Sequence, residues 1–315
     1  MNTLTDKAKK ALRPLMSAIA KFDLPTSLSV KLFNTYISPI ILYNVENWGI
    51  LSDKNVQNRD ENHIYNLTNS SNADVIHRKF LKYILGLSNS SPNISVYGET
   101  GETPLSIKGY RHMLNYWKRL TNLPDECLAK KALIENVNLR TNWIKTIEKL
   151  IRTFELIEVP ENKFRQKNAT NTNHYFVESW KKAIKNDISP RLKVYKTINP
   201  NFDMAKHLDL PFKQRKIISK LRCSNHTLEI EKGRHTRPKT PQEQRYCKLC
   251  QDGSVKDENH FLNDCGTFTP IKDLFNIHET NLINILNMDD QKTLGRYLLS
   301  AFETRANFIN GRGRV

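Results

Sequence analysis

The sequence predicts a mainly α-helical protein with a small zinc-stabilised module near its C-terminus. Apolar residues recur every three or four positions along most of the 315-residue chain, which is the pattern of amphipathic helices. We find no strong run of strictly alternating apolar residues, the pattern expected of half-buried strands. Three cysteines and a histidine between residues 247 and 265 have the spacing of metal ligands.

The first fifty residues predict two helices separated by proline. An apolar stripe from Leu4 to Phe22 ends before Pro25, and residues 27–37 repeat the pattern. Pro39 should bend or end the second helix, because proline lacks the amide hydrogen and clashes with the preceding turn. Residues 52–73 are polar and rich in Asn and Ser, so we expect a loop there.

The central part of the chain predicts three further helical stripes. The stripe that begins at His77 ends at Gly86, which suits a C-terminal cap. Thr103 and Pro104 suit an N-cap followed by proline at the first helical position. Residues 143–154 form another stripe. Residues 159–174 are polar and unpatterned, so we expect a linker there.

The last third of the chain combines helices with the cysteine and histidine cluster. A third helical block begins at Phe176, and a basic stretch from Lys213 to Arg222 follows it. The tail carries a clear helical stripe from Leu294 to Phe302.

The positive charge of the chain is localised. The net charge is +17, and residues 151–246 carry 21 basic and 10 acidic residues, a net +11. A concentrated basic surface attracts polyanions, of which nucleic acid is the most common. The alternative is a solvated Lys/Arg surface that serves solubility. The candidate phosphate-binding residues are Lys213, Arg215, Lys216, Lys220, Arg222, Arg234 and Arg237.

Cysteine usage and hydropathy favour an intracellular protein, in the nucleus or the cytoplasm. Five cysteines are too few for a disulfide framework in a chain of this length. The longest strongly apolar stretch, residues 36–45, is too short to cross a bilayer, so we expect no membrane partner. The first twenty residues carry four basic side chains within an amphipathic pattern, unlike a secretory signal.

The sharpest local motif is Cys247-x2-Cys250-x9-His260-x4-Cys265. Thiolate and imidazole ligands suit tetrahedral zinc, and a Cys-x2-Cys pair can turn two sulfur atoms toward one point. Four protein ligands indicate a structural zinc ion, because a hydrolytic site keeps one position open for water. The alternative is that three buried cysteines and a surface histidine lie near one another by chance.

Two other groups of polar residues invite a chemical interpretation. His226 and His235, with Cys223 nearby, could form a second metal site, but a core or surface role for the histidines is the better interpretation. Asp289 and Asp290 resemble the paired aspartates of a polymerase only superficially. They precede the tail helix, where aspartate is a good N-cap and complements the helix dipole.

The first half of the chain resembles the thumb and post-thumb regions of non-LTR (LINE-like) retrotransposon reverse transcriptases. The matching stretches are Lys7-Ala8, Lys10-Ala11, Leu32-Phe33, residues 38–43 and 46–49, then residues 80–86 and 93–99, Gly101, Pro104-Leu105 and residues 116–120. The family pattern near residue 43 reads approximately P-I-L-L-Y-G-x-E-x-W-G. Asn44 stands at the usual glycine, and Asn47 lies between Glu46 and Trp48.

The C-terminal third is similar to the same family. A recurrent R-x-S-x-H-x-L-x-x-E-x-G-R stretch is matched by Arg222, Ser224, His226, Leu228, Glu231, Gly233 and Arg234. It leads into the zinc motif, which contains Asp257, Glu258 and Phe261. The resemblance implies four segments: thumb-like (1–51), post-thumb helical (74–158), basic helical (175–246) and a CCHC zinc module with the C-terminal helix (247–315).

The resemblance implies a non-catalytic chain that binds RNA or DNA. The family's palm, with its catalytic aspartates, lies upstream of the matching stretches, so no catalytic residue is carried over and we expect a truncated or partial polyprotein. Two alternatives remain open. The chain could be an accessory part of an RNA-directed DNA polymerase that works with a separately encoded palm. It could also be a host protein-interaction module derived from the element.

Overall fold

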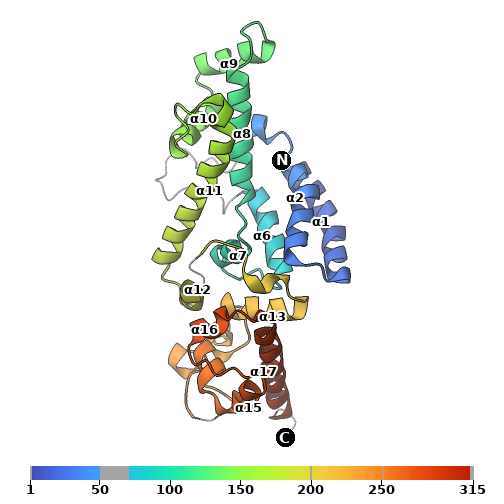
Figure 1. Ribbon diagram of the computed structural model, residues 1–315, viewed down its shortest axis with the longest axis vertical. Helices are drawn as coiled ribbons and strands as arrows, with labels where there is room; N and C mark the ends of the chain where they lie inside the picture. Colours follow the sequence, from blue (N-terminus) through green and yellow to red (C-terminus); the bar gives the residue numbers. More distant parts are fainter. Residues whose placement is uncertain (1, 50–70, 199–200, 251, 313–315) are drawn as a thin grey trace. The chain divides into compact units, whose positions relative to one another are not determined.

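The computed structural model describes residues 2–49, 71–198, 201–250 and 252–312 (Figure 1). The described residues are mainly α-helical, which confirms the predicted fold class. Strand-like pairing in these ranges is limited to two isolated bridges, Thr100 with Met204 and Tyr246 with Val255.

The chain forms two compact units, each assembled from segments that are far apart in sequence. Unit 1 comprises residues 1–15, 32–79 and 102–185, and unit 2 comprises residues 16–31, 80–101 and 186–315. Four helices contribute residues to both units: α1 (Asn2–Phe22), α2 (Thr26–Tyr36), α6 (Asn72–Ile84) and α11 (Glu161–Asn186), the last with only Asn186 in unit 2.

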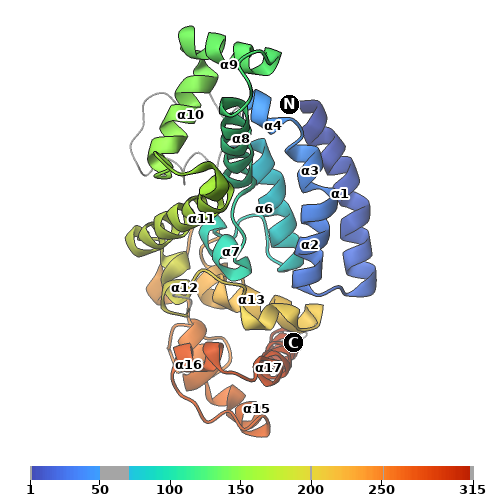
Figure 2. The same cartoon turned by 45° about the horizontal axis from the view of Figure 1, so that its top comes forward.

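Unit 1 is built around the long helix α8. Its remaining helices are α3 (Ser38–Ile41), α4 (Val45–Trp48), α8 (Leu105–Thr121), α9 (Leu128–Asn138), α10 (Asn142–Thr153) and α11 (Glu161–Asn186). Helices α4, α9 and α10 pack against α8, as Figure 2 shows. Leu120, Leu133 and Ile144 form a small apolar cluster where α8, α9 and α10 meet. The Trp143 indole N–H donates to the Glu46 carbonyl at 2.8 Å, which ties α10 to α4.

A buried carboxylate joins two helix N-termini in unit 1. The Ser71 hydroxyl oxygen accepts from the Asp74 amide at 3.0 Å and donates to the Asp74 carboxylate at 2.7 Å. The other carboxylate oxygen of Asp74 accepts from the Ser106 amide, in the first turn of α8, at 3.1 Å. The Ser71 hydroxyl and the Asp74 carboxylate therefore each satisfy one backbone amide, in the first turns of α6 and α8 respectively.

Unit 2 has its core between α13 and α17, which lie side by side in Figure 1. Its helices and turns are α7 (Asn93–Thr100), η2 (Pro190–Leu192), α12 (Lys193–Ile198), η3 (Lys206–Asp209), α13 (Phe212–Arg222), α14 (Glu229–Lys232), η4 (Gln242–Gln244), η5 (His260–Asp264), η6 (Gly266–Phe268), α15 (Thr269–Leu274), α16 (Leu282–Asn287) and α17 (Gln291–Arg312). Ile218 and Leu221 of α13 and Leu298 of α17 are fully buried in one apolar cluster, which also contains Cys247 and Cys265.

Buried arginines tie distant segments of unit 2 together. The Arg222 Nε atom donates to both carboxylate oxygens of Glu99 at 3.0 Å, and its Nη1 donates to the Leu286 carbonyl at 3.1 Å. Arg305 on α17 donates to a carboxylate oxygen of Glu229 at 2.8 Å. Charge-assisted bonds of this kind compensate for removing the ions from water.

Most of the predicted helices are confirmed. The first stripe is α1, and the chain breaks between α2 and α3, where Pro39 occupies the first turn of α3. Gly86 has a φ of +66°, the left-handed conformation of a helix C-cap. The stripe at residues 143–154 is α10, and the tail stripe lies within α17.

Two local predictions are wrong. The segment expected to be a linker, residues 159–174, is mostly the first half of α11, because Phe164, Asn168 and Thr172 are buried on one side of that helix. Helix α8 begins at Leu105, with Pro104 itself at the cap position, one residue later than predicted. The predicted loop at residues 52–73 lies outside the described residues except at its end, where α6 already begins.

The position that departs from the family pattern has a physical explanation. Asn44 has a φ of +55°. Glycine enters this left-handed region most easily, and asparagine is among the few other residues that tolerate it. Asparagine can therefore replace the usual glycine here with little backbone cost.

The four sequence segments drawn from the resemblance remain a prediction about domain organisation.

Candidate metal centre

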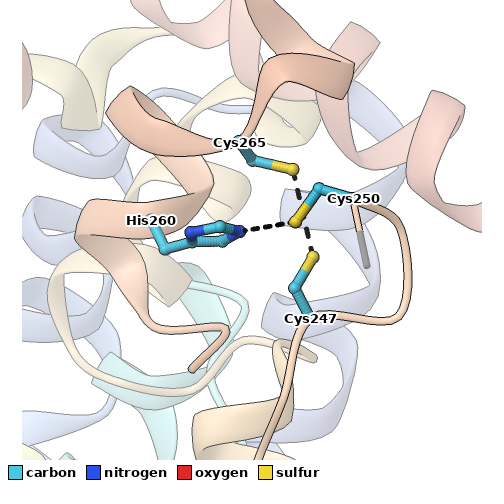
Figure 3. Close-up of side chains that lie close together, drawn as sticks. All are labelled: Cys247, Cys250, His260 and Cys265. Atoms are coloured by element: carbon cyan, nitrogen blue, oxygen red, sulfur yellow. Dashed lines mark hydrogen bonds between the residues drawn. The ribbon is translucent and has the colours of Figure 1, made fainter. Parts of the chain in front are cut away.

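Cys247 and Cys250 are presented by a short hairpin turn. The Cys247 amide donates to the Ser254 carbonyl at 2.8 Å, which closes the turn. The Leu249 amide donates to the Cys247 sulfur at 3.4 Å. This bond favours a thiolate at Cys247, because an N–H donor stabilises the charged form of its acceptor. The tight turn brings both sulfur atoms to one side (Figure 3).

His260 and Cys265 are presented by a single wide helical turn, η5. The Cys265 amide donates to the His260 carbonyl at 2.9 Å, five residues back, so the turn is of the π type. The carboxylate of Asp257 accepts from the His260 amide at 2.9 Å and caps the start of the turn. Turns of this type often occur at functional sites. Here the turn directs both side chains toward the two hairpin cysteines (Figure 3).

The four ligand atoms have the spacing of a tetrahedral site. They all lie within 4.8 Å of one another. The Cys247 and Cys265 sulfur atoms are 3.9 Å apart, and the Cys250 sulfur is 3.3 Å from Nε2 of His260. Zn–S bonds of about 2.3 Å and Zn–N bonds of about 2.0 Å would place two sulfurs ~3.8 Å apart and a sulfur and a nitrogen ~3.5 Å apart. The cluster can therefore hold a metal ion with little rearrangement.

Lys256 lies in the core directly beside this cluster. Its side chain is fully buried, and Nζ has no hydrogen-bond partner in the described residues. The ammonium lies 4.5 Å from the ring centroid of Phe268 and 5.1 Å from that of Phe261. The Lys256 amide donates to the Arg245 carbonyl at 2.9 Å, so Lys256 and Cys247 are diagonal neighbours on one face of the hairpin.

The second metal site considered above is not formed in the described residues. His226 is buried, and its Nε2 atom lies 2.9 Å from a carboxylate oxygen of Glu258. Cys223 is fully buried, and burial raises the pKa of its thiol. His235 is exposed. The core and surface interpretation of these residues is therefore the one that agrees with the structure.

The paired aspartates lie at the start of α17, as the sequence predicts. The carboxylate of Asp290 accepts from the Thr293 amide at 3.0 Å and from the Thr293 hydroxyl at 2.7 Å, which is the geometry of an N-cap. Asp289 is exposed and forms an ion pair with Lys206 at 2.6 Å. The two carboxylates thus bind different partners rather than converging on one point.

The candidate phosphate-binding residues fall into two groups. Lys213 and Arg237 are exposed, and Lys216, Lys220 and Arg234 are partly exposed. The structure places the remaining two candidates, Arg215 and Arg222, in the interior. Arg215 is 1% exposed and donates to the Leu210 carbonyl at 3.0 Å, whereas Arg222 is 5% exposed and bound to Glu99. Their guanidinium groups are internal hydrogen-bond donors and do not face solvent.

Three residues important to this region escaped the sequence analysis: Lys256, Glu258 as the partner of His226, and Glu99 as the partner of Arg222. The sequence around a lysine or glutamate in a polar stretch does not reveal whether its side chain is buried. The one available signal was indirect. Arg222 and His226, the partners of Glu99 and Glu258, both lie in the R-x-S-x-H-x-L-x-x-E-x-G-R stretch noted in the sequence.

The chain matches no known protein-family model, and we found no curated protein or solved structure with significant similarity to it. No helix among the described residues has the length and apolar character needed to span a membrane.

Proposed function

We propose that this chain is a non-catalytic nucleic-acid-binding protein, folded in part by a structural zinc ion, that corresponds to the C-terminal portion of a non-LTR retrotransposon reverse transcriptase. In such an enzyme this portion would hold the template–primer duplex or the element RNA while another part carries out polymerisation. The relation to the family rests on the sequence resemblance described above.

The zinc part of the proposal is supported by the ligand set. Cys247, Cys250, His260 and Cys265 provide three sulfurs and one imidazole nitrogen, which favour zinc over magnesium or calcium. Four converging protein ligands fill a tetrahedral shell, as in structural zinc sites. The ion would crosslink the hairpin and the wide turn, two segments with little regular secondary structure between them.

One observation supports the proposal of nucleic-acid binding, namely the exposed face of α13. Lys213, Lys216 and Lys220 are spaced three and four residues apart, so they share one side of the helix. None of the three has a carboxylate partner in the described residues. Burial and the neighbouring charge of Lys216 both lower the pKa of Lys220. Like charges at this spacing destabilise a helix, and a bound phosphate backbone would relieve that repulsion.

Salt-dependent binding tests this proposal. Fluorescence anisotropy should detect binding to mixed-sequence duplex DNA and to single-stranded RNA. If the five accessible candidates, Lys213, Lys216, Lys220, Arg234 and Arg237, all contact duplex phosphates, log affinity should fall against log salt with a slope of about −4.5. The K213A/K216A/K220A variant should make the slope shallower by about 2.7.

The matched control is K181A/K182A/K185A, which removes three exposed lysines from α11 and changes the net charge equally. It should leave the slope near that of the wild-type protein. Affinity that does not change with salt would show that the basic residues serve solubility instead. An equal effect of the two triple variants would mean that α13 has no particular role.

A further inference from the structure

Unit 2 contains a cavity of about 360 Å³ beside the metal-binding module. The loop that follows α13 forms one wall, with Ser224 and Thr227. The end of α14 and the residues after it form another, with Lys232 and His235. Arg191, in the turn η2, also lines the cavity. The volume lies within the range of small-ligand sites, and it exceeds the space needed for one phosphate group.

One buried donor in this cavity has no partner. The Nε atom of Arg191 is inaccessible to solvent and makes no hydrogen bond to any described residue. A buried donor without an acceptor costs free energy, and most such groups in proteins have a partner. The Nη atoms of the same guanidinium are not enclosed and make no hydrogen bond in the described residues, so an acceptor-rich ligand in the cavity would bind there.

The charges around the cavity favour an anion. Arg191 and Lys232 are cationic. Glu231 is the one carboxylate among the lining residues, and Arg234 offsets it at 3.2 Å. Glu258, whose carboxylate lies 2.9 Å from Nε2 of His226, is not among the lining residues. The excess of positive charge, together with the Ser224 and Thr227 hydroxyl donors, suits a phosphate oxygen.

We propose that this cavity binds a phosphate group of a nucleic acid, with Arg191 and Lys232 as its charged ligands. The inference rests on the proposed function and specifies where one strand is anchored. Lys232 begins a stretch, residues 232–248, that holds six Lys or Arg residues and one Glu. A strand anchored at the cavity could therefore continue along basic residues toward Cys247.

The experiment uses the full zinc-loaded chain and short fluorescein-labelled oligonucleotides. R191Q/K232Q should weaken binding at least tenfold at fixed salt and make the salt slope shallower by about 0.7–0.9, the contribution of one phosphate. K193Q/K292Q removes two exposed lysines outside both the cavity and the basic stretch 232–248, and it should change affinity less than threefold. R191K/K232R, which keeps both charges, should retain most of the affinity. Zinc content and thermal melting verify that each variant folds.

Two further arms identify the phosphate. If the wild-type protein prefers 5′-phosphorylated to 5′-hydroxyl strands and R191Q/K232Q does not, the cavity binds the phosphate at a strand end. If the wild-type protein binds the two kinds of strand equally, the cavity binds an internal phosphate. Inorganic phosphate at constant ionic strength should displace strands from the wild-type protein more than from R191Q/K232Q.

Equal losses of affinity in R191Q/K232Q and K193Q/K292Q would overturn the cavity assignment and leave the proposed function intact. Equal displacement of strands by phosphate from the wild-type protein and from R191Q/K232Q would do the same. Absence of any nucleic-acid binding by the wild-type protein would instead contradict the proposed function. In that case, calorimetric titration with pyrophosphate tests the cavity by itself, and no heat difference between wild type and R191Q/K232Q would exclude it.

Discussion

Lys256 is the residue whose burial most needs an explanation. An ammonium taken out of water costs several kcal/mol unless opposite charge lies nearby. The two aromatic rings beside it provide part of the compensation. Three thiolates and a Zn²⁺ ion would carry a net charge of −1, which the ammonium would neutralise. Lys256 therefore fits the metal-bound form of the module better than the metal-free form.

Lys256→Met should lower zinc affinity about tenfold, the smaller end of the effect seen when groups around metal ligands are changed. Methionine keeps the length and removes the charge. Competition with a chromophoric chelator measures the affinity. Lys248→Met is the control, because Lys248 is exposed and adjacent to Cys247 in sequence. Equal zinc affinities in the wild-type protein and in Lys256→Met would show that the charge does not act on the metal centre.

Asp74 makes stability depend on pH. Burial raises the pKa of its carboxyl from 3.8 to about 6, even though Ser71 and Ser106 donate hydrogen bonds to it. The folded protein thus binds this proton more tightly than the unfolded chain. Between pH 5 and 7.5 the free energy of unfolding should therefore decrease by about 1.4 kcal/mol from this group, the opposite of the usual carboxylate behaviour.

In Asp74→Asn this contribution should be absent. Urea unfolding at both pH values would then show the wild-type protein losing about 1.4 kcal/mol more than the variant as pH rises. Asp125→Asn, at an exposed position, should parallel the wild-type protein. Parallel pH profiles for the wild-type protein and Asp74→Asn would contradict the raised pKa.

At the scale of elements, the Cys/His cluster joins two pieces of chain that are too short to be stable alone. The hairpin is held by few backbone bonds, and the wide turn spans only five residues, His260–Asp264. Cys247 and Cys265 also belong to the apolar core of α13 and α17. Loss of the metal should therefore affect the packing of unit 2 and not only the local loop.

Cys250→Ser should reduce the metal content from about one zinc per chain and destabilise unit 2. A loss of 3–5 kcal/mol would lower the melting temperature by on the order of 10 °C for a unit of this size. Elemental analysis and thermal melting provide the two readouts. Cys127→Ser, outside the cluster, should leave both unchanged. Metal-free wild-type protein that melts at the same temperature with and without added zinc would refute a structural site.

The whole molecule is predicted to lack polymerase activity. Reverse transcription needs two metal ions held by carboxylates that converge, whereas Asp290 caps α17 and Asp289 pairs with Lys206. We expect no primer extension on any primed template, with magnesium or manganese. Replacing both residues with Asn should lower stability by about 1 kcal/mol or less and leave nucleic-acid affinity nearly unchanged. Primer extension that disappears in this double variant would overturn the helix-cap assignment and the non-enzyme proposal.

The sequence by itself determined the helical class, the break at Pro39, the cap at Gly86 and the four Cys and His residues that cluster. These features depend on residues close together in the chain, where periodicity and turn chemistry act directly. The Cys247-x2-Cys250 spacing, for example, constrains both sulfurs within one turn.

Only the tertiary structure decided which charged residues are internal. Arg215 and Lys213 have the same sequence character, yet one is buried beside Leu210 and the other faces solvent. Helix α11 formed where a polar segment predicted a linker, because its buried residues find partners elsewhere in unit 1, as Thr172 does with Arg111. The physical reason is that burial depends on contacts between segments more than fifty residues apart, which no local pattern encodes.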